Sequence, residues 1–163
     1  MVSRTENNFN MKKVAVIGAG PSGIAAIKNF KDQDFNVTAF ERCSGVVGNW
    51  RYNDPSGHSS VFETTHIISS KYTSFYEDFP LPNDAADYPS HEELLRYFQG
   101  YTDHFDLEKI IKFNTEVIHC SQEANHKWKI KWKNLTTNEV KTDIFDALVV
   151  CNGHHHEPRF PKY

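Results

Sequence analysis

The sequence of 163 residues lacks several features that would place a protein in a class at first sight. It has only three cysteines, Cys43, Cys120 and Cys151, and without a C-x-x-C spacing they argue against a disulfide framework and a zinc site. No dense run of Lys or Arg is present and the formal net charge is −3, so neither nucleic acid nor an anionic membrane surface is an expected partner. The polar start MVSRTENNFN is unlike a signal peptide, and no apolar run is long enough to span a membrane. We therefore expect a cytoplasmic protein with reduced thiols.

The composition that remains is that of one globular domain. Hydrophobic residues make up 39% of the chain and aromatic residues 13%, which suffices for a core at this length. The sequence contains no internal repeat and no low-complexity segment. We expect residues 1–12 to form a polar N-terminal extension and residues 13–163 to form the domain.

The stretch VAVIGAGPSGIAAIKNF, residues 14–30, changes its apolar spacing at the glycines. The residues before the glycines form a continuous apolar run typical of a buried strand, whereas those after them recur at helical spacing. This pattern predicts a strand, a tight turn and a helix. Gly18, Gly20 and Gly23 fit the G-x-G-x-x-G fingerprint, in which the first glycine allows the turn, the second admits a pyrophosphate and the third lets helix and strand pack closely.

The predicted helix opens at Pro21 and Ser22, directly after the turn. Its first amide groups have no partners within the helix, and its dipole places partial positive charge there, which favours a bound diphosphate. A glycine-rich turn can also be no more than a tight connection, so the residues that follow have to decide.

A second strand is predicted over residues 36–40, and it ends in Glu41. An acidic residue at this place, about 20 residues after the glycines, can accept hydrogen bonds from both hydroxyls of a ribose. The alternative is an ordinary exposed carboxylate at a strand end. A 2′-phosphate would meet the charge of Glu41, so FAD or NAD fits this turn and NADP does not.

The segment over residues 41–60 has no sustained period and contains several Gly and Pro, which predicts a long loop. Loops of this length inside a domain are usually functional, and Asn49 and Trp50 could lie against a flat ring system. The alternative is a surface loop in which Trp50 fills a gap in the core.

A helix is predicted over residues 91–104, because Ser90 and Glu93 have the spacing of a capping box. Apolar residues recur along it at helical spacing. The expected core stripe consists of Leu94, Leu95, Phe98 and Tyr101.

The last third of the chain is rich in predicted strands. We expect them over residues 110–113, 116–118, 127–132, a return strand through Val140, and 145–151. The alternation of residues 127–132 is typical of an antiparallel sheet, whereas the apolar run of residues 145–151 is typical of a central parallel strand. Because ligands of parallel sheets gather at the carboxyl ends of strands, Gly153 should lie near Gly18. The fold class is therefore α/β, Rossmann-like, with a parallel central sheet and a small antiparallel β-meander.

Five ordered blocks of sequence carry a family resemblance. They read GAGPSG, FERCSGVVGNWRY, HIISSKYTSFYEDFP, DYPSHEELLRYFQGYTDHF and DALVVCNGHHHEPRFP. This succession resembles the N-terminal, FAD-binding part of flavin-containing monooxygenases, and the resemblance covers essentially the whole chain.

The resemblance implies a chemistry that the cofactors supply. Enzymes of the family reduce FAD with NADPH, trap O2 as a flavin hydroperoxide, and pass one oxygen atom to a small amine or sulfide substrate. The protein binds and shields the cofactor, so no nucleophile and base pair is expected and we assign no catalytic residue. The residues expected to bind the cofactor are Gly18, Ala19, Gly20, Pro21, Ser22, Gly23, Glu41, Asn49, Trp50, Ser69 and the backbone at Val117.

The sequence departs from the family in a segment where many members have T-N-x-S-K. The Asn of that segment helps to hold the hydroperoxide, whereas this chain has Ile68, which cannot donate a hydrogen bond. His66, Ser69 or Ser70 could compensate, and a core strand at this place is an equally good interpretation.

The chain also stops at Tyr163, before the family's F-x-G-x-x-x-H signature and its second glycine fingerprint, which binds NADPH. We therefore expect an incomplete FAD-binding domain, the N-terminal part of an oxidoreductase with two dinucleotide-binding domains. NADPH would be bound by a domain absent from this chain.

Two other functions stay open at the level of sequence. The chain could be a nucleotide-binding module without chemistry of its own, or part of a flavin disulfide reductase, although the latter usually has a redox-active cysteine pair. Three adjacent histidines, His154, His155 and His156, point in different directions and do not converge on one metal ion, so we expect no metal. The sequence does not determine the oligomeric state.

Overall fold

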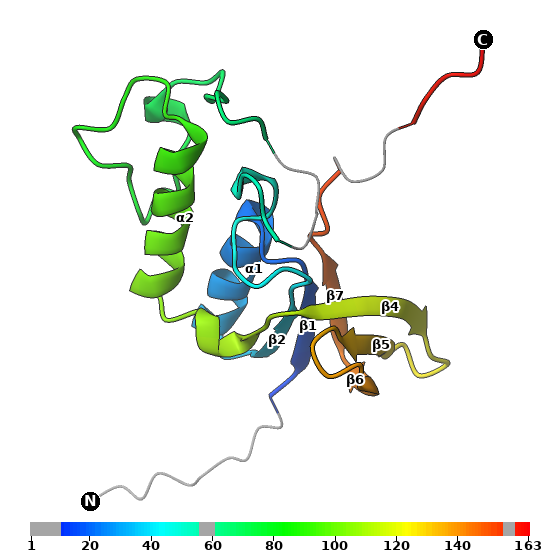
Figure 1. Cartoon of the computed structure of the whole chain (residues 1–163). Helices are drawn as coiled ribbons and strands as arrows, with labels where there is room; N and C mark the ends of the chain where they lie inside the picture. Colours follow the sequence, from blue (N-terminus) through cyan, green and yellow to red (C-terminus); the bar gives the residue numbers. More distant parts are fainter. Residues whose placement is uncertain (1–10, 56–60, 155–158) are drawn as a thin grey trace, which may run out of the picture.

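The computed structural model describes residues 11–55, 61–154 and 159–163. In these residues, two small sheets and two α-helices pack together (Figure 1). The first sheet is parallel and has the strand order β3-β2-β1-β7. Its strands are β1 (Lys13–Ile17), β2 (Asn36–Phe40), β3 (Ile111–Lys112) and β7 (Ala147–Val150). The second sheet is an antiparallel meander of β4 (Thr115–Gln122), β5 (Trp128–Asn134) and β6 (Val140–Phe145). The α/β class with a β-meander is confirmed.

Two α-helices, α1 (Pro21–Asp32) and α2 (His91–His104), lie on one side of the parallel sheet (Figure 1). Three short 3-10 turns, η1 (Gly48–Trp50), η2 (Lys71–Thr73) and η3 (Glu108–Ile110), interrupt the loops. No helix within the described ranges has both the length and the apolar character needed to cross a lipid bilayer.

The period of two in a β-strand explains why the parallel sheet has a core on each face. Val14 and Val16 of β1 belong to the larger cluster, with Ile24 and Ile27 of α1 and apolar residues of α2. Ala15, between the two valines, points the other way. It lies in a second cluster with Phe40 of β2 and with Ile130, Trp132 and Phe145 of the meander. The molecule therefore has three layers.

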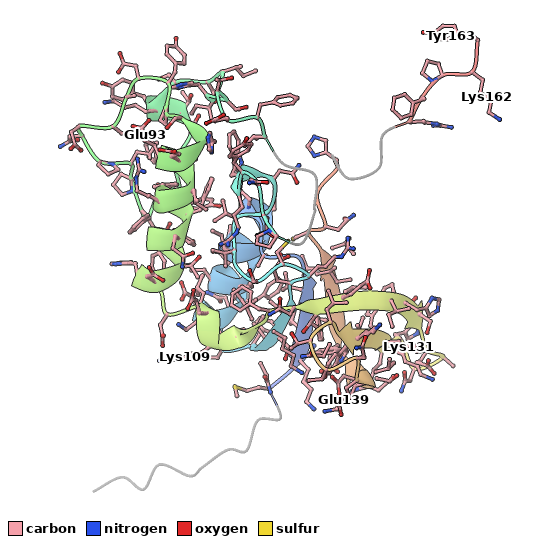
Figure 2. All side chains as sticks on the ribbon, in the orientation of Figure 1. Glu93, Lys109, Lys131, Glu139, Lys162 and Tyr163 are labelled. Atoms are coloured by element: carbon pink, nitrogen blue, oxygen red, sulfur yellow. The ribbon has the colours of Figure 1, made fainter. Side chains whose placement is uncertain are left out.

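The prediction for the second helix is confirmed at both ends. The helix spans His91–His104, and the capping box of Ser90 and Glu93 is formed at its start. Figure 2 shows Glu93 at that end of the helix. Three residues of the predicted stripe, Leu94, Phe98 and Tyr101, are buried, whereas Leu95 is half-buried and Tyr97 joins them in the core.

Two strand predictions were wrong in extent. The segment 116–118 is only part of the longer strand β4. The prediction stopped too early because a β-bulge between Val117 and His119 interrupts the alternation of side chains from which a strand is predicted. The run 145–151 is divided at Asp146, whose backbone N–H donates to the Lys13 carbonyl and whose carboxylate accepts from the Lys13 N–H. Phe145 thus ends the meander, and β7 lies at the edge of the parallel sheet as described rather than in its centre.

Candidate functional site

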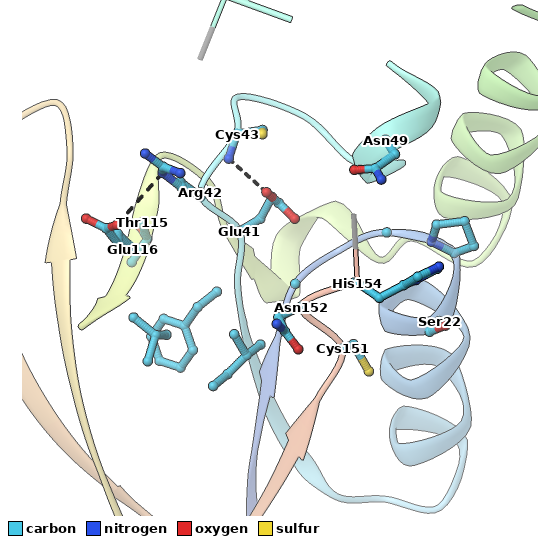
Figure 3. Close-up of a pocket in the computed structure, with 18 of the residues that line it drawn as sticks. Ser22, Glu41, Arg42, Cys43, Asn49, Thr115, Glu116, Cys151, Asn152 and His154 are labelled. Atoms are coloured by element: carbon cyan, nitrogen blue, oxygen red, sulfur yellow. Dashed lines mark hydrogen bonds and ion pairs between the residues drawn. The ribbon is translucent and has the colours of Figure 1, made fainter. Parts of the chain in front are cut away.

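A cavity of about 460 Å³ opens where the carboxyl ends of β1, β2 and β7 meet the start of α1 (Figure 3). Its volume falls in the range of small-molecule sites, about 300–1,000 Å³. Most of the residues that the sequence singled out line it, namely Gly18, Gly20, Pro21, Ser22, Glu41, Asn49, Trp50 and Val117. Gly153 lines the same cavity as Gly18, as the strand order predicted.

Gly18 and Gly23 are required by the close approach of the polypeptide to itself. Gly18 has a φ of +94°, and a Cβ atom there would lie 2.4 Å from the carbonyl oxygen of Cys151. A Cβ atom on Gly23 would lie 2.0 Å from the carbonyl oxygen of Gly18. Both distances are far below van der Waals contact. Only residues without a Cβ atom therefore allow β1, β7 and α1 to approach each other this closely.

Gly20 differs from its two neighbours in the fingerprint. Its backbone is extended, with φ −69° and ψ −176°, a conformation open to any residue. A Cβ atom there would meet only the Cα atom of Gly48, at 3.9 Å. Both glycines line the cavity. No contact within the described part of the protein excludes a side chain at Gly20. The space that such a side chain would fill belongs to the cavity.

The start of α1 faces this space without a side-chain cap among the described residues. Gly20 occupies the N-cap position and Pro21 and Ser22 follow in the first turn. Amide groups of a first helical turn have no carbonyl partner within the helix, and the helix dipole adds partial positive charge. The arrangement is suited to an anion such as a diphosphate.

The carboxylate of Glu41 is buried at the end of β2, with only 6% of the residue exposed. Its two oxygens accept hydrogen bonds from the backbone N–H groups of Ala19, at 2.6 Å, and Cys43, at 2.8 Å. Figure 3 shows the bond between Glu41 and Cys43. A carboxylate has about four lone-pair sites, so each oxygen can accept one more hydrogen bond. The interpretation of Glu41 as an ordinary exposed acid is therefore wrong.

Several residues of the cavity escaped the sequence analysis. Arg42 and Glu116 lie next to each other at one side of the cavity, with 3.8 Å between Nε and Oε1, and Thr115 lies beside them (Figure 3). Arg42 directly follows Glu41 in the sequence, so it could have been predicted to lie near the same cavity. Thr115 and Glu116 could not be found, because the start of β4 meets β2 only through tertiary folding.

Three of the expected residues lie outside the cavity lining. Ala19 is buried behind the turn and donates its N–H to Glu41, and Gly23 lies beneath the turn. Ser69 is exposed, and its hydroxyl pairs with that of Ser74 at 2.7 Å. The structure therefore does not bring Ser69 together with the other expected residues.

The segment around Ile68 is not a core strand. Ile67 is buried in the main cluster, whereas Ile68 is 99% exposed and neither residue belongs to a named strand. Trp50 packs against the main core cluster, as its alternative interpretation expected, and it also lines the cavity. Its contact with a flat ring system stays a prediction.

Thiol and metal chemistry find little support at this site. No disulfide joins Cys43, Cys120 and Cys151. Burial raises the pKa of the Cys151 thiol, which disfavours its nucleophilic thiolate. Among the residues described, no group of His, Cys, Asp and Glu side chains could hold a metal ion. His154 lines the cavity, whereas His155 and His156 lie outside the described residues.

The parallel sheet, the glycine turn and the buried acid define a Rossmann-like protein of the dinucleotide-binding class. Comparison with known sequences narrows the class. A sequence profile described as flavin-binding monooxygenase-like matches residues 11–163, and the chain belongs to this family.

Individual relatives agree with this result. Dimethylaniline monooxygenase (N-oxide-forming) 2 of Oryctolagus cuniculus is 37% identical over 154 residues, which cover 92% of this chain and 29% of the relative. The structure of S-allyl-L-cysteine S-oxygenase from Allium sativum is similar with a TM-score of 0.84 and 29% identity, over 93% of this chain and 38% of that one. Oxidized steroid monooxygenase bound to NADP gives a TM-score of 0.73 and 27% identity, over 94% of this chain and 28% of that one. The chain thus spans less than two fifths of the length of each.

Proposed function

We propose that the chain is the FAD-binding part of an NADPH-dependent flavin monooxygenase that oxygenates a soft nitrogen or sulfur nucleophile. Family membership supports the reaction class, and the relatives include an N-oxide-forming and an S-oxygenating enzyme. The NADP bound to the steroid monooxygenase supports NADPH as the reductant. We also propose a cytoplasmic location, because the chain has an odd number of cysteines and no disulfide joins them.

The residues of the cavity fit FAD in two independent ways. The space beside Gly20, which the protein does not fill, lies at the uncapped start of α1 and would hold the diphosphate at Pro21 and Ser22. Glu41 has one acceptor site left on each carboxylate oxygen for the two ribose hydroxyls.

The remaining residues of the cavity are assigned by their place in it. We propose that Val117, which lines the cavity together with Glu41, contacts the adenine, and that Asn49 and Trp50 lie toward the flavin. We propose no contact of Ser69 with the part of the cofactor that lies in this cavity, because Ser69 does not line it and its hydroxyl pairs with that of Ser74.

Bound FAD would supply the redox chemistry of oxygen activation, and the chain's own residues bind and orient it. Glu41 also limits which nucleotide fits. Its negative charge, held in place by two backbone N–H groups, would repel a 2′-phosphate on the ribose. The site thus selects FAD over NADP, and NADPH has to bind elsewhere in the whole protein.

The observation that carries the proposal is the buried Glu41 carboxylate beside the uncapped helix start, in a chain of this family. The test uses the complete protein, purified and examined for a flavin spectrum. NADPH oxidation and product formation are then measured with trimethylamine and with a thioether. Yellow protein with turnover supports the proposal, and a colourless preparation that takes up no added FAD contradicts it.

A second candidate function is favoured by Ile68, which stands where many family members have an Asn. An exposed isoleucine cannot donate a hydrogen bond to an oxygenated flavin. The complete protein would then bind FAD and oxidise NADPH without oxygenating its substrate. Hydrogen peroxide release at the rate of NADPH oxidation, with no N-oxide or S-oxide, would identify this case.

A further inference from the structure

A hydrogen bond joins two segments that are far apart in the sequence at the start of α1. The hydroxyl of Tyr76 donates to the carbonyl oxygen of Pro21 at a distance of 2.7 Å. Tyr76 lies in the loop between η2 and α2, whereas Pro21 is the first residue of α1 and lines the cavity. The loop therefore contacts the same helical turn that is proposed to hold the diphosphate.

Other contacts hold Tyr76 in place, and its hydroxyl is the donor of this hydrogen bond. Its backbone N–H donates to the Tyr97 hydroxyl at 2.7 Å, and that hydroxyl donates in turn to the Phe79 carbonyl at 2.6 Å. Its ring packs against Tyr101 with 4.4 Å between centroids. Burial raises the pKa of the Tyr76 phenol, so the hydroxyl stays protonated and acts as a donor at neutral pH.

The carbonyl of Pro21 and the N–H of Ser22 belong to the same peptide unit. A hydrogen bond to the carbonyl oxygen polarises that unit and makes its N–H a stronger donor, which is the cooperativity seen in chains of hydrogen bonds. The carbonyl has two lone pairs, so it can accept from Tyr76 in addition to its helical partner. Ser22 lines the cavity and lies in the uncapped first turn.

We propose that Tyr76 is a positioning residue of the cofactor site, whose hydroxyl polarises the Pro21–Ser22 peptide and thereby strengthens the Ser22 N–H as a donor to the diphosphate. This role rests on the proposed function, because it needs a dinucleotide at the start of α1. It also explains why a tyrosine and not a phenylalanine serves here, since the ring contacts alone require no hydroxyl.

The test compares the complete protein with its Tyr76→Phe variant, which keeps the ring and removes the donor. We expect the dissociation constant of FAD to rise about three- to tenfold. The ³¹P resonance of one phosphorus atom of bound FAD should move, because the donor facing it is weaker. The melting temperature of the FAD-free variant should stay within about 4 °C of the wild type, since the Pro21 carbonyl keeps its helical bond.

Tyr97→Phe is the matched control. It removes the hydroxyl that accepts from the Tyr76 backbone N–H and so loosens the same loop, but it keeps the Tyr76 hydroxyl that donates to Pro21. It should lower the melting temperature at least as much and leave the ³¹P spectrum as in the wild type. Unchanged FAD affinity and ³¹P shifts in Tyr76→Phe would overturn the role of Tyr76. An equal loss of affinity in Tyr97→Phe would overturn it too, by assigning the effect to loop stability. If the wild type itself took up no FAD, the proposed function would fail instead.

Discussion

At the scale of single residues, the three glycines after β1 divide into two that the fold needs and one that it does not. A Cβ atom on Gly23 would clash with the Gly18 carbonyl, whereas one on Gly20 would make only an ordinary van der Waals contact with Gly48. A residue that is small without any demand from the protein's own packing indicates that something else approaches it. Substitution can therefore separate folding from binding.

We predict that Gly20→Ala weakens FAD binding at least tenfold, or by about 1.4 kcal/mol, because the new methyl group occupies the space of the diphosphate. The stability of the FAD-free protein should change by less than about 1 kcal/mol. An alanine restricts the unfolded chain but is a poorer N-cap, and these effects oppose each other. Titration of FAD fluorescence and thermal unfolding measure the two quantities.

Gly23→Ala is the contrasting variant. Its methyl group would lie 2.0 Å from a backbone oxygen, so α1 has to move away from β1, and we expect a loss of more than about 3 kcal/mol of stability.

The prediction for Gly20→Ala has a clear contrary outcome. Equal FAD affinity in Gly20→Ala and the wild type would show that no ligand approaches Gly20.

The other residue of consequence is Glu41, whose oxygens are held by the N–H groups of Ala19 and Cys43. We predict that Glu41→Gln weakens FAD binding about ten- to a hundredfold, since a charge-assisted hydrogen bond is worth roughly 1.5–3 kcal/mol. The amide NH2 would also face one of the two backbone donors, so the melting temperature should fall.

Glu116→Gln is the control for Glu41→Gln, because Glu116 lines the same cavity but is half-exposed and pairs only loosely with Arg42. Its FAD affinity should stay within about threefold of the wild type. A Glu41→Gln variant that retains FAD as well as Glu116→Gln does would show that Glu41 only shapes the loop.

At the scale of elements, α2 is fixed at its start by a carboxylate that reaches beyond the helix. Glu93 accepts from the Ser90 N–H at 2.9 Å and from the Ala86 N–H at 3.1 Å. It therefore joins the helix to the proline-rich loop before it. These backbone hydrogen bonds, from Ser90 first and Ala86 second, lower the pKa of the Glu93 carboxyl below its usual 4.5.

A lowered pKa in the folded state means that protonation favours the unfolded chain. The stabilisation by Glu93 is thus present above its unfolded-state pKa near 4.5 and is lost as the pH falls through the lower folded-state value. We predict that Glu93→Gln costs about 1 kcal/mol at pH 7 and that this difference from the wild type shrinks below pH 4. Thermal unfolding from pH 7 to pH 3 measures it.

Glu92→Gln provides the reference for Glu93→Gln. Glu92 lies in the same helical turn, but its carboxylate is exposed and only approaches Arg96, at 3.9 Å. The variant should show the wild-type dependence on pH. A constant difference between Glu93→Gln and the wild type from pH 7 to pH 3 would contradict the prediction.

At the scale of the whole molecule, the cavity that holds the glycine turn lies at the carboxyl end of the parallel sheet. Val150 of β7 is 61% exposed, so the edge strand of the described sheet is only partly covered. The curated relative from Oryctolagus cuniculus is more than three times as long as the segment it shares with this chain.

We predict that residues 1–163 expressed alone do not couple NADPH oxidation to oxygenation of an amine or a sulfide, whereas the gene's complete product does. Hydride transfer needs a nicotinamide held against the flavin, and such proximity requires a second binding site. NADPH oxidation and product formation are compared at equal flavin content. Turnover by residues 1–163 at the rate of the complete protein would show that the described cavity serves both nucleotides.

The local features of the chain could be predicted from its amino-acid sequence. The strand, turn and helix at residues 14–30, the acid after the second strand and both ends of α2 follow from spacing, glycine chemistry and capping, which act within a few residues of the chain. For this reason Gly18, Gly20 and Glu41 could be named in advance.

The tertiary structure alone decided what depends on distant segments. Arg42 meets Glu116, β4 continues past its bulge to Gln122, and Ser69 stays apart from the cavity, none of which follows from local pattern. The bond from Tyr76 to Pro21 is the clearest case, because it joins residues that are 55 positions apart. Local sequence fixes what a turn can bind, and packing between distant segments decides which side chains reach it.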